Sequence, residues 1–387
     1  MNTARSEQYS VAILFCINGF ITGSWAVQIA QLVPRFNVTD KIIGYMILIF
    51  GLGALSMMPL TGFLMSKFAS QHILRIFSLI ASVALIPVGL SPYIIILVPT
   101  LFFLGATIGG MNVAMNSNAV AVEKAHSRAV LSSCHCFWSI GLFIAGLVGG
   151  YLVENFGFLI HILIICSVAF ALTLAVSPLI LKDARPKTYQ VIVKRGLLGN
   201  FNIYIIGIIA FLAMIPECAV VDWSSRYLLK DLNATTDVAS FAFACFAGTM
   251  ALCRYWGDAL RNRFSAILIV RVSSLIAGGG LFTAAIVNNP LQAILAFAIS
   301  GIGIANLVPI AFSAAGNQPN VSISTGMSIA TTIGYLGTLL APAPIGFIAQ
   351  KIGFPIVYIA LAVMLVVIFL LAPFIRRAEF TTTHTAN

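Results

Sequence analysis

The sequence predicts an all-α integral membrane protein, with 12 transmembrane helices arranged as two pseudo-twofold-related six-helix bundles. Three observations lead to this fold class. Hydrophobic residues make up 60% of the 387 residues and charged residues only 8%, whereas a soluble domain carries roughly a quarter charged residues. Apolar runs long enough to cross a bilayer recur along the chain. The two halves of the sequence also match each other at a constant offset.

The apolar runs define the helices in order, because a bilayer core takes about 20 predominantly apolar residues per helix. The first run is too long for a signal-peptide core and lacks a cleavage site, so we expect it to be retained. The basic stretch 182–200 is a cytoplasmic linker between an N-terminal bundle (1–181) and a C-terminal bundle (201–387). The predicted spans are 9–33, 42–66, 73–91, 93–121, 129–152, 157–181, 202–227, 237–256, 265–287, 290–315, 323–348 and 355–375.

An internal repeat relates the two predicted bundles. Adding 196 to a position in the first half gives its partner in the second, from the third span to the start of the twelfth. Unrelated apolar helices would not keep one register over this length, so the pattern indicates duplication. Matched pairs include Arg75 with Arg271, Gly105 with Gly301, Gly141 with Gly337, and Gly157 with Gly353.

The charged residues indicate orientation. The formal charge is +10, but the basic residues are spread through short connectors, so no nucleic-acid partner is expected. With a cytoplasmic N-terminus, 16 of the 21 basic residues fall on the cytoplasmic side and only Arg35, Lys41, Arg226, Lys230 and Lys351 fall outside. Cytoplasmic loops carry such an excess. We therefore expect both termini in the cytoplasm and the lipid bilayer as the main surrounding partner.

The cysteines predict neither a disulfide framework nor a metal centre. All seven lie within apolar runs, unlike the cysteines of small secreted scaffolds. Cys134-His135-Cys136 resembles a metal cluster, but adjacent helical residues point about 100° apart and cannot close on one ion. No metal or cofactor is expected.

Two six-helix halves joined by a basic linker resemble the major facilitator superfamily over essentially the full chain. Gly141-x-x-x-Ala145-Gly146-x-x-Gly149-Gly150 is similar to the glycine-rich packing motif of that family, and small residues allow helices to approach closely in lipid. The stretch from Met111 to Glu123, together with His135 and Trp138-Ser139, resembles a bacterial subfamily related to sugar permeases. The resemblance implies a multi-pass protein of the cell inner membrane, with a central cavity lined by spans 1, 4, 7 and 10.

Polar residues at helical spacing on these spans are candidates for substrate binding, because intramembrane polar groups require a partner or a function. For the asparagines, the alternative is interhelical hydrogen bonding that only holds the bundle together. The candidate substrate-binding residues are Asn18, Thr22, Trp25, Gln28, Asn112, Asn116 and Asn306 on these spans, together with Trp138 and Ser139 on the fifth span and Thr331 and Tyr335 on the eleventh.

Glu217 is the candidate proton carrier, since it is the carboxylate nearest the middle of a predicted span. Pro216 precedes it, so we expect the seventh helix to be kinked or interrupted there. Burial favours the neutral form of the glutamate, and entry of water favours proton release. His135 is a second candidate because histidine titrates near physiological pH. The alternative for both is a permanently neutral side chain hydrogen-bonded inside the bundle.

A gate and charge network is expected near the ends of the helices. Asp222 and Arg226, four residues apart, are predicted to pair with each other. Arg75 is predicted to pair with Glu123 or to anchor its helix. Its repeat partner, Arg271, is predicted to anchor its own helix. The network comprises Arg75, Glu123, Asp222, Arg226, Arg254, Asp258 and Arg271, with Arg254 and Asp258 assigned to an inner gate after the eighth span.

Together these observations predict a secondary active transporter that moves a small, neutral, sugar-like solute by alternating access. We expect a monomeric, proton-coupled symporter. A proton-driven multidrug or metabolite exporter is the alternative. A membrane enzyme would need a cluster of catalytic groups, a channel would show a filter signature, and an ATP-driven pump would need a phosphate-binding loop; the sequence contains none of these.

Overall fold

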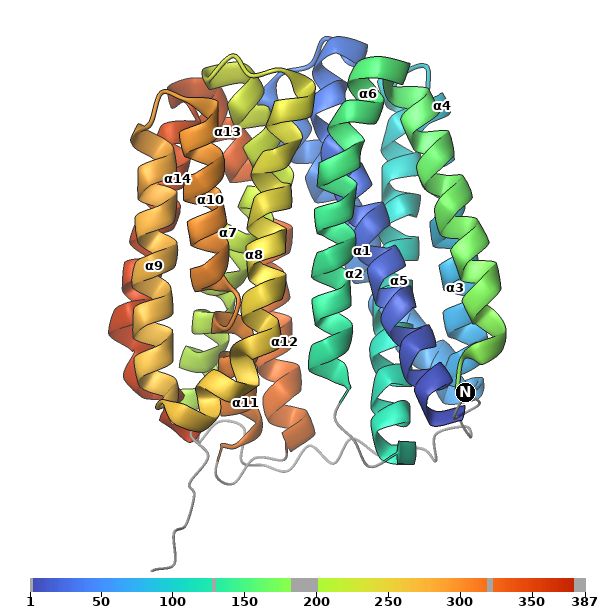
Figure 1. Ribbon diagram of the computed structural model, residues 1–387, viewed down its shortest axis with the longest axis vertical. Coiled ribbons are helices and arrows are strands. Elements are labelled where there is room, and N and C mark those ends of the chain that lie inside the picture. The colour runs from blue at the N-terminus through green and yellow to red at the C-terminus, as the bar shows by residue number, and fades with distance from the viewer. Residues whose placement is uncertain (1–2, 127–129, 182–200, 319–322, 379–387) are drawn as a thin grey trace, which may run out of the picture.

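The computed structural model describes residues 3–126, 130–181, 201–318 and 323–378 (Figure 1). These residues are almost entirely helical, as the length and apolar character of the runs predict. The helices are α1 (Thr3–Phe36), α2 (Asp40–Lys67), α3 (Ser70–Val83), α4 (Leu85–Leu90), α5 (Ile94–His126), α6 (Leu131–Val176), α7 (Phe201–Asp231), α8 (Thr236–Arg263), α9 (Ala266–Ile286), α10 (Pro290–Ile304), α11 (Leu307–Gly316), α12 (Ile323–Leu340), α13 (Pro342–Ile352) and α14 (Phe354–Leu371), with the 3₁₀ turns η1 (Ser177–Leu179) and η3 (Ala372–Ala378).

The described chain makes twelve passes. Eleven segments within it are long and apolar enough to span a membrane, but one of them, Ser133–Leu179, has 47 residues. At 1.5 Å per residue such a helix would measure about 70 Å, more than twice the thickness of a bilayer core. The chain instead reverses at Gly157, where φ is 80° and ψ is 163°, and Figure 1 shows α6 running up and then down. The predicted fold class is confirmed.

The helix ends and turns lie at two opposite ends of the bundle. The "termini face" holds residues 3, 181, 201 and 378, and the "distal face" holds the turns at 37–39, 91–93, 157, 232–235, 287–289 and 353. The helices of residues 3–181 gather on one side of the molecule and those of residues 201–378 on the other (Figure 1). The predicted linker, 182–200, lies outside the described residues.

Three helix breaks coincide with prolines. Pro342 begins α13, Pro87 follows the break at Ala84, and Pro309 follows the junction of α10 and α11. Proline cannot donate the backbone bond that a helix requires and clashes with the carbonyl four residues earlier. Of the predicted kink or interruption at Pro216, the interruption is excluded, because α7 is one helix from Phe201 to Asp231 with Pro216 inside it.

Backbone geometry extends the repeat beyond the register seen in the sequence. Gly157 and Gly353 both have positive φ, at 80° and 90°. Asn37 and Asn233, also 196 positions apart, have φ of 51° and 52°, a left-handed conformation that asparagine tolerates better than most residues. The offset of 196 therefore also relates the first two helices of each half. The match of side chains along the sequence had traced the register only from the third span onward.

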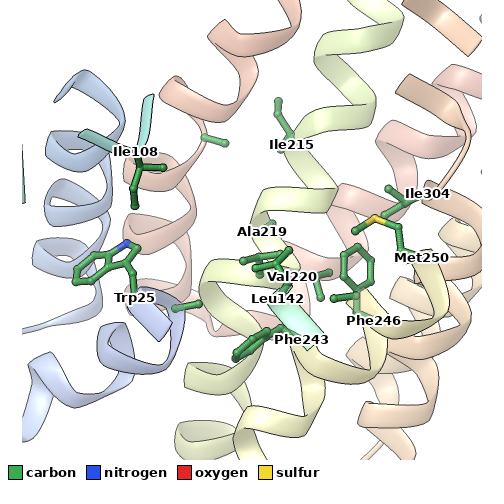
Figure 2. Close-up of a cluster of buried hydrophobic side chains, with 14 of the residues drawn as sticks. Trp25, Ile108, Leu142, Ile215, Ala219, Val220, Phe243, Phe246, Met250 and Ile304 are labelled. Atoms are coloured by element: carbon green, nitrogen blue, oxygen red, sulfur yellow. The ribbon is translucent and has the colours of Figure 1, made fainter. Parts of the chain in front are cut away.

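One buried hydrophobic cluster extends through both halves. Figure 2 labels Trp25, Ile108 and Leu142 from the first half together with Phe243, Phe246 and Met250 from the second. Exposed apolar side chains such as Ile95 on α5, Leu291 on α10 and Leu370 on α14 lie on the surface of the bundle. Lipid is as apolar as these side chains, so helix contacts here depend on close packing rather than on escape from water.

Candidate functional site

A buried ion pair joins α7 to α8. Nη2 of Arg254 donates to both carboxylate oxygens of Glu217, at 3.0 Å from Oε1 and 3.3 Å from Oε2. The side chains are only 12% and 15% exposed. Glu217 lies at the middle of α7, so the pair is far from both ends of the bundle. Breaking a buried pair by neutralising one partner leaves an uncompensated charge, which is strongly unfavourable.

Arg254 lies deeper than the inner-gate position predicted for it. The eighth helix continues to Arg263, more than two turns beyond Arg254. Its Nε donates to the carbonyl of Ala305 at 3.2 Å, at the junction of α10 and α11. That carbonyl would normally accept from the residue four positions later, which is Pro309 and has no N–H. A proline therefore frees an acceptor that helps to position Arg254.

Arg254 also connects the two halves. Its Nη1 donates to Ser139 Oγ on α6 at 3.1 Å, and the Ser139 hydroxyl donates to the carbonyl of His135 at 3.3 Å. The His135 ring contacts Phe15 edge-on, with centroids 5.1 Å apart, and lies within electrostatic range of Arg254. The structure thus brings together both predicted proton-coupling residues, Glu217 and His135, around an arginine that the sequence analysis assigned elsewhere.

Two further predicted residues are on α12, which packs against α7. Tyr335 is within electrostatic range of Glu217, and Thr331 lies one turn before it, partly buried. Asn306 is 9% exposed at the α10–α11 junction, where its side chain faces Gly257.

The polar residues of α1 are used in packing within the first half. Asn18 Nδ2 donates to the carbonyl of Ile108 at 3.4 Å, and its Oδ1 accepts from Trp138 Nε1 at 3.0 Å. Thr22 donates to the carbonyl of Asn18, and Trp25 is fully buried against Phe50. This placement favours the bundle-holding alternative for Asn18 over substrate binding.

Gln28 forms a second buried polar pair, closer to the distal face. Its Nε2 lies 2.8 Å from Nδ1 of His161, and both side chains are fully buried. By contrast, the hydrogen bonds of Asn116 among the described residues stay within its own helix, where it donates to the carbonyl and Oδ1 of Asn112 at 2.8 and 3.0 Å. Both asparagines remain partly exposed, so they stay available to a ligand.

The predicted gate network is rearranged. Arg226 pairs across the halves with Asp40, Nε to Oδ1 at 2.8 Å, and Lys230 Nζ lies 2.5 Å from Asp40 Oδ2. The predicted Asp222–Arg226 pair is therefore wrong, because Arg226 pairs with Asp40 on α2 instead. Sequence reasoning missed Asp40, because spacing along one helix cannot show a partner on α2.

The other predicted network residues have separate surroundings. Arg75 Nε donates to the carbonyl of Ser177 at 3.0 Å, which suits an anchoring role. Its repeat partner Arg271 lies over the Phe369 ring, 5.3 Å from the centroid. The side chains of Glu123 and Asp258 are outside the described part of the chain, so the predicted Arg75–Glu123 pair is untested.

The distal face is closed by two interfaces that the repeat makes equivalent. Gly150 of α6 packs on Thr236 and Ser240 of α8, and Gly346 of α13 packs on Asp40 and Gly44 of α2. A side-chain oxygen also caps each facing helix. Glu154 Oε2 accepts from Thr236 N, and Gln350 Oε1 accepts from Lys41 N, both at 3.2 Å. Backbone N–H groups in the first turns of α2 and α8 thereby donate to side chains of the other half. We call these contacts, with the Asp40 ion pairs, the distal latch.

The described residues contain no group of three His, Cys, Asp or Glu side chains placed to hold a metal ion. Their polar site is instead an ion pair buried where two repeated halves meet within a twelve-pass bundle. That combination defines a polytopic membrane transport protein.

The sequence profile of the Major Facilitator Superfamily matches residues 11–313, and the chain belongs to this family of secondary transporters. An MFS-type transporter of Yersinia pestis is 30% identical over 94% of this chain and 94% of its own length. The membrane protein MosC of Rhizobium meliloti is 29% identical over 89% of this chain and 84% of its own length. Neither description names a sugar, so the closer resemblance to sugar permeases is not supported beyond the family.

Solved structures share the fold at low identity. A bacterial homolog of the human lysosomal transporter Spinster, described as inward-facing and occupied, superimposes with a TM-score of 0.76 at 15% identity, over 97% of this chain and 98% of that one. The Escherichia coli fucose:proton symporter FucP gives 0.64 at 16% identity, over 95% and 99%.

Proposed function

We propose that this secondary transporter is a proton-coupled symporter in which Glu217 carries the proton and Arg254 is its charge partner. The observation that supports this role most directly is the buried Glu217–Arg254 pair, with Ser139 of the other half held by the same guanidinium. Protonation of Glu217 removes the charge that holds Nη2 of Arg254. A proton therefore changes a contact at the junction of the halves.

Other titratable groups surround the pair and are part of its electrostatic environment. Those on α6 are His135 and Cys136, those on α7 are Cys218 and Asp222, and α12 contributes Tyr335. Only Glu217 hydrogen-bonds to Arg254 among these, which is why we assign the proton to Glu217 and keep His135 as the second candidate.

The closed distal latch supports alternating access by rocking of residues 1–181 against residues 201–387. With both termini in the cytoplasm of a cell whose inner membrane holds the protein, a closed distal face corresponds to an inward-facing state. Duplicated halves in such transporters move around a central site. We propose that a monomer carries out this cycle.

The proposed substrate is a small polar organic solute. The expectation of a neutral, sugar-like molecule fits the ion pair as long as Glu217 is ionised, because the two charges then cancel. FucP, which shares the fold, is described as a fucose:proton symporter. The alternative, a multidrug exporter, is less favoured for cationic drugs because they would meet the charge of Arg254 whenever Glu217 is protonated.

Replacement of Glu217 by glutamine tests the proposal, because glutamine mimics the protonated side chain. In proteoliposomes with an imposed pH gradient and a panel of labelled sugars, amino acids and organic acids, Glu217→Gln should abolish accumulation above equilibrium. Counterflow exchange of the same solute should persist. Glu7→Gln, the same substitution at a glutamate that pairs with His126 at the termini face, is the matched control and should still accumulate solute. Undiminished pH-driven accumulation by a folded Glu217→Gln protein would exclude the role and direct attention to His135.

A further inference from the structure

We propose that the substrate is a small organic carboxylate, whose charge replaces that of Glu217 opposite Arg254 when Glu217 takes up its proton. This inference rests on the proposed function, since it uses the same proton and the same site, and it adds the chemical class of the substrate. It differs from the neutral solute that low overall charge in the sequence suggested.

The charge balance around Arg254 supports the proposal. Its described hydrogen-bond partners are Glu217, the neutral hydroxyl of Ser139 and the neutral carbonyl of Ala305. Arginine does not lose its proton in proteins. When Glu217 is neutralised, a guanidinium that is only 12% exposed loses its one anionic hydrogen-bond partner. Such a charge is strongly unfavourable unless another anion pairs with it.

The geometry suits a carboxylate in particular. In this structure Nη2 of Arg254 spans both oxygens of the Glu217 carboxyl group, and Nη1 points to Ser139. Nη1 and Nε keep their neutral partners when Glu217 is protonated, so the donor that is released is Nη2. Nη2 already lies where it reaches both oxygens of a carboxyl group, and a charge-assisted hydrogen bond to an incoming carboxylate can replace the one that is lost. A ligand held there contacts the second half through Arg254 and lies beside Ser139 of the first.

The same arrangement couples the binding of the proton to the binding of the substrate. The site has no net charge with Glu217 ionised, one positive charge after protonation, and none again after a monocarboxylate binds. Each ligand therefore strengthens binding of the other, as linkage requires. The nearby groups His135, Cys136, Cys218, Asp222 and Tyr335 modulate this balance. A neutral solute cannot supply the negative charge that the released guanidinium has lost, which is the source of the predicted selectivity.

Formate and its neutral analogue formamide provide the sharpest test on the full-length protein. In Glu217→Gln the site is permanently positive, so sodium formate should raise the melting temperature. A rise of about 2 °C is expected at a concentration about tenfold above the dissociation constant. Formamide at the same concentration, and sodium chloride at the same ionic strength, should not reproduce the rise. The double variant Glu217→Gln/Arg254→Gln should show no response specific to formate.

Equal effects of formate and formamide on Glu217→Gln, or the same rise in the double variant, would overturn the inference. An equal rise in melting temperature with chloride would show that the site binds anions in general, and this too would refute the proposed specificity for a carboxylate. If Glu217→Gln does not fold, the wild-type protein gives the answer, because formate should stabilise it more at about pH 5 than at about pH 8. Equal stabilisation at both pH values would again refute it. If Glu217→Gln loses pH-driven accumulation but shows no response to formate, the proton-coupling role of Glu217 is supported and only the proposal of a carboxylate substrate is refuted.

Discussion

Asn18 shows what a single polar residue on a membrane helix can and cannot reveal. Its polarity predicted a partner, and the structure supplies two, Trp138 on α6 and the carbonyl of Ile108 on α5. Sequence spacing placed Asn18 on one face of α1 but could not show which helices cover that face. Asn116 differs because its partners belong to the same helix.

We predict opposite consequences for alanine at these two positions. Asn18→Ala leaves the indole N–H of Trp138 without its partner and should cost about 1–2 kcal/mol of stability, with little effect on substrate affinity. Asn116→Ala should weaken substrate binding with little loss of stability, because no other helix depends on it. Thermal unfolding and equilibrium substrate binding, measured on both proteins, decide the matter. A stable Asn18→Ala with impaired binding would restore Asn18 to the substrate site.

At the level of helices, close approach across the halves depends on glycine. A Cβ atom at Gly44 would lie 2.6 Å from the carbonyl oxygen of Pro342, and one at Gly146 would lie 2.6 Å from Cβ of Ala244. Real Cβ atoms do not approach other atoms this closely without a shift of the backbone. Within the glycine-rich motif of α6, Gly146 and Gly150 pack on α8 of the other half, whereas Gly141 packs on α1 of its own half, so part of the motif lets the distal latch close.

Gly44→Val should therefore keep the distal face from closing. Gly62, on the same helix, has open space around it, so Gly62→Val is the matched control. Spin labels at Thr39→Cys and Thr235→Cys, both exposed on the distal face, report the separation in a background without the native cysteines. We expect longer distances in Gly44→Val and unchanged ones in Gly62→Val. Identical distances in the two variants would contradict the steric explanation.

Helix positions and the repeat were largely predictable from the sequence, while the contacts of the site were not. Apolar runs and glycines recur at an offset that pattern analysis detects. The predicted eighth span, 237–256, agrees with the membrane-spanning part of α8, Thr236–Gly257. The sequence did not show that the helix continues to Arg263, and Arg254 was therefore assigned to an inner gate. Glu217 and Arg254 are on different helices, so their pairing follows only from tertiary packing. Pro216 leaves α7 uninterrupted, since neighbouring helices can hold a proline within a continuous span.

On the scale of the whole molecule, the distal latch is asymmetric in charge. The glycine contacts and helix caps occur twice, once on each side of the pseudo-twofold axis. The ion pairs of Asp40 with Arg226 and Lys230 occur on one side only. The Asp40 side chain is 4% exposed, so these pairs are screened little by salt.

Asp40→Asn should shift the whole molecule towards a distal-open state, because Arg226 and Lys230 lose their shared partner and then repel each other. The Thr39–Thr235 label distance should lengthen, while a second pair at Lys67→Cys and Arg263→Cys on the termini face should shorten in the same sample. Coordinated, opposite changes are expected if each half moves as one body. Opening of the distal pair without any change at the termini face would instead indicate local fraying of the gate.

The repeat offset has a consequence for the history of this protein. Glu217 and Arg254 correspond, 196 positions earlier, to Ile21 and Met58. An ancestor with identical halves would have carried the ion pair twice or not at all, so the present asymmetry postdates duplication. One copy retained or acquired the charges and the other kept an apolar surface with a serine. Divergence of two initially equal copies has thus left this ion pair in the second half alone.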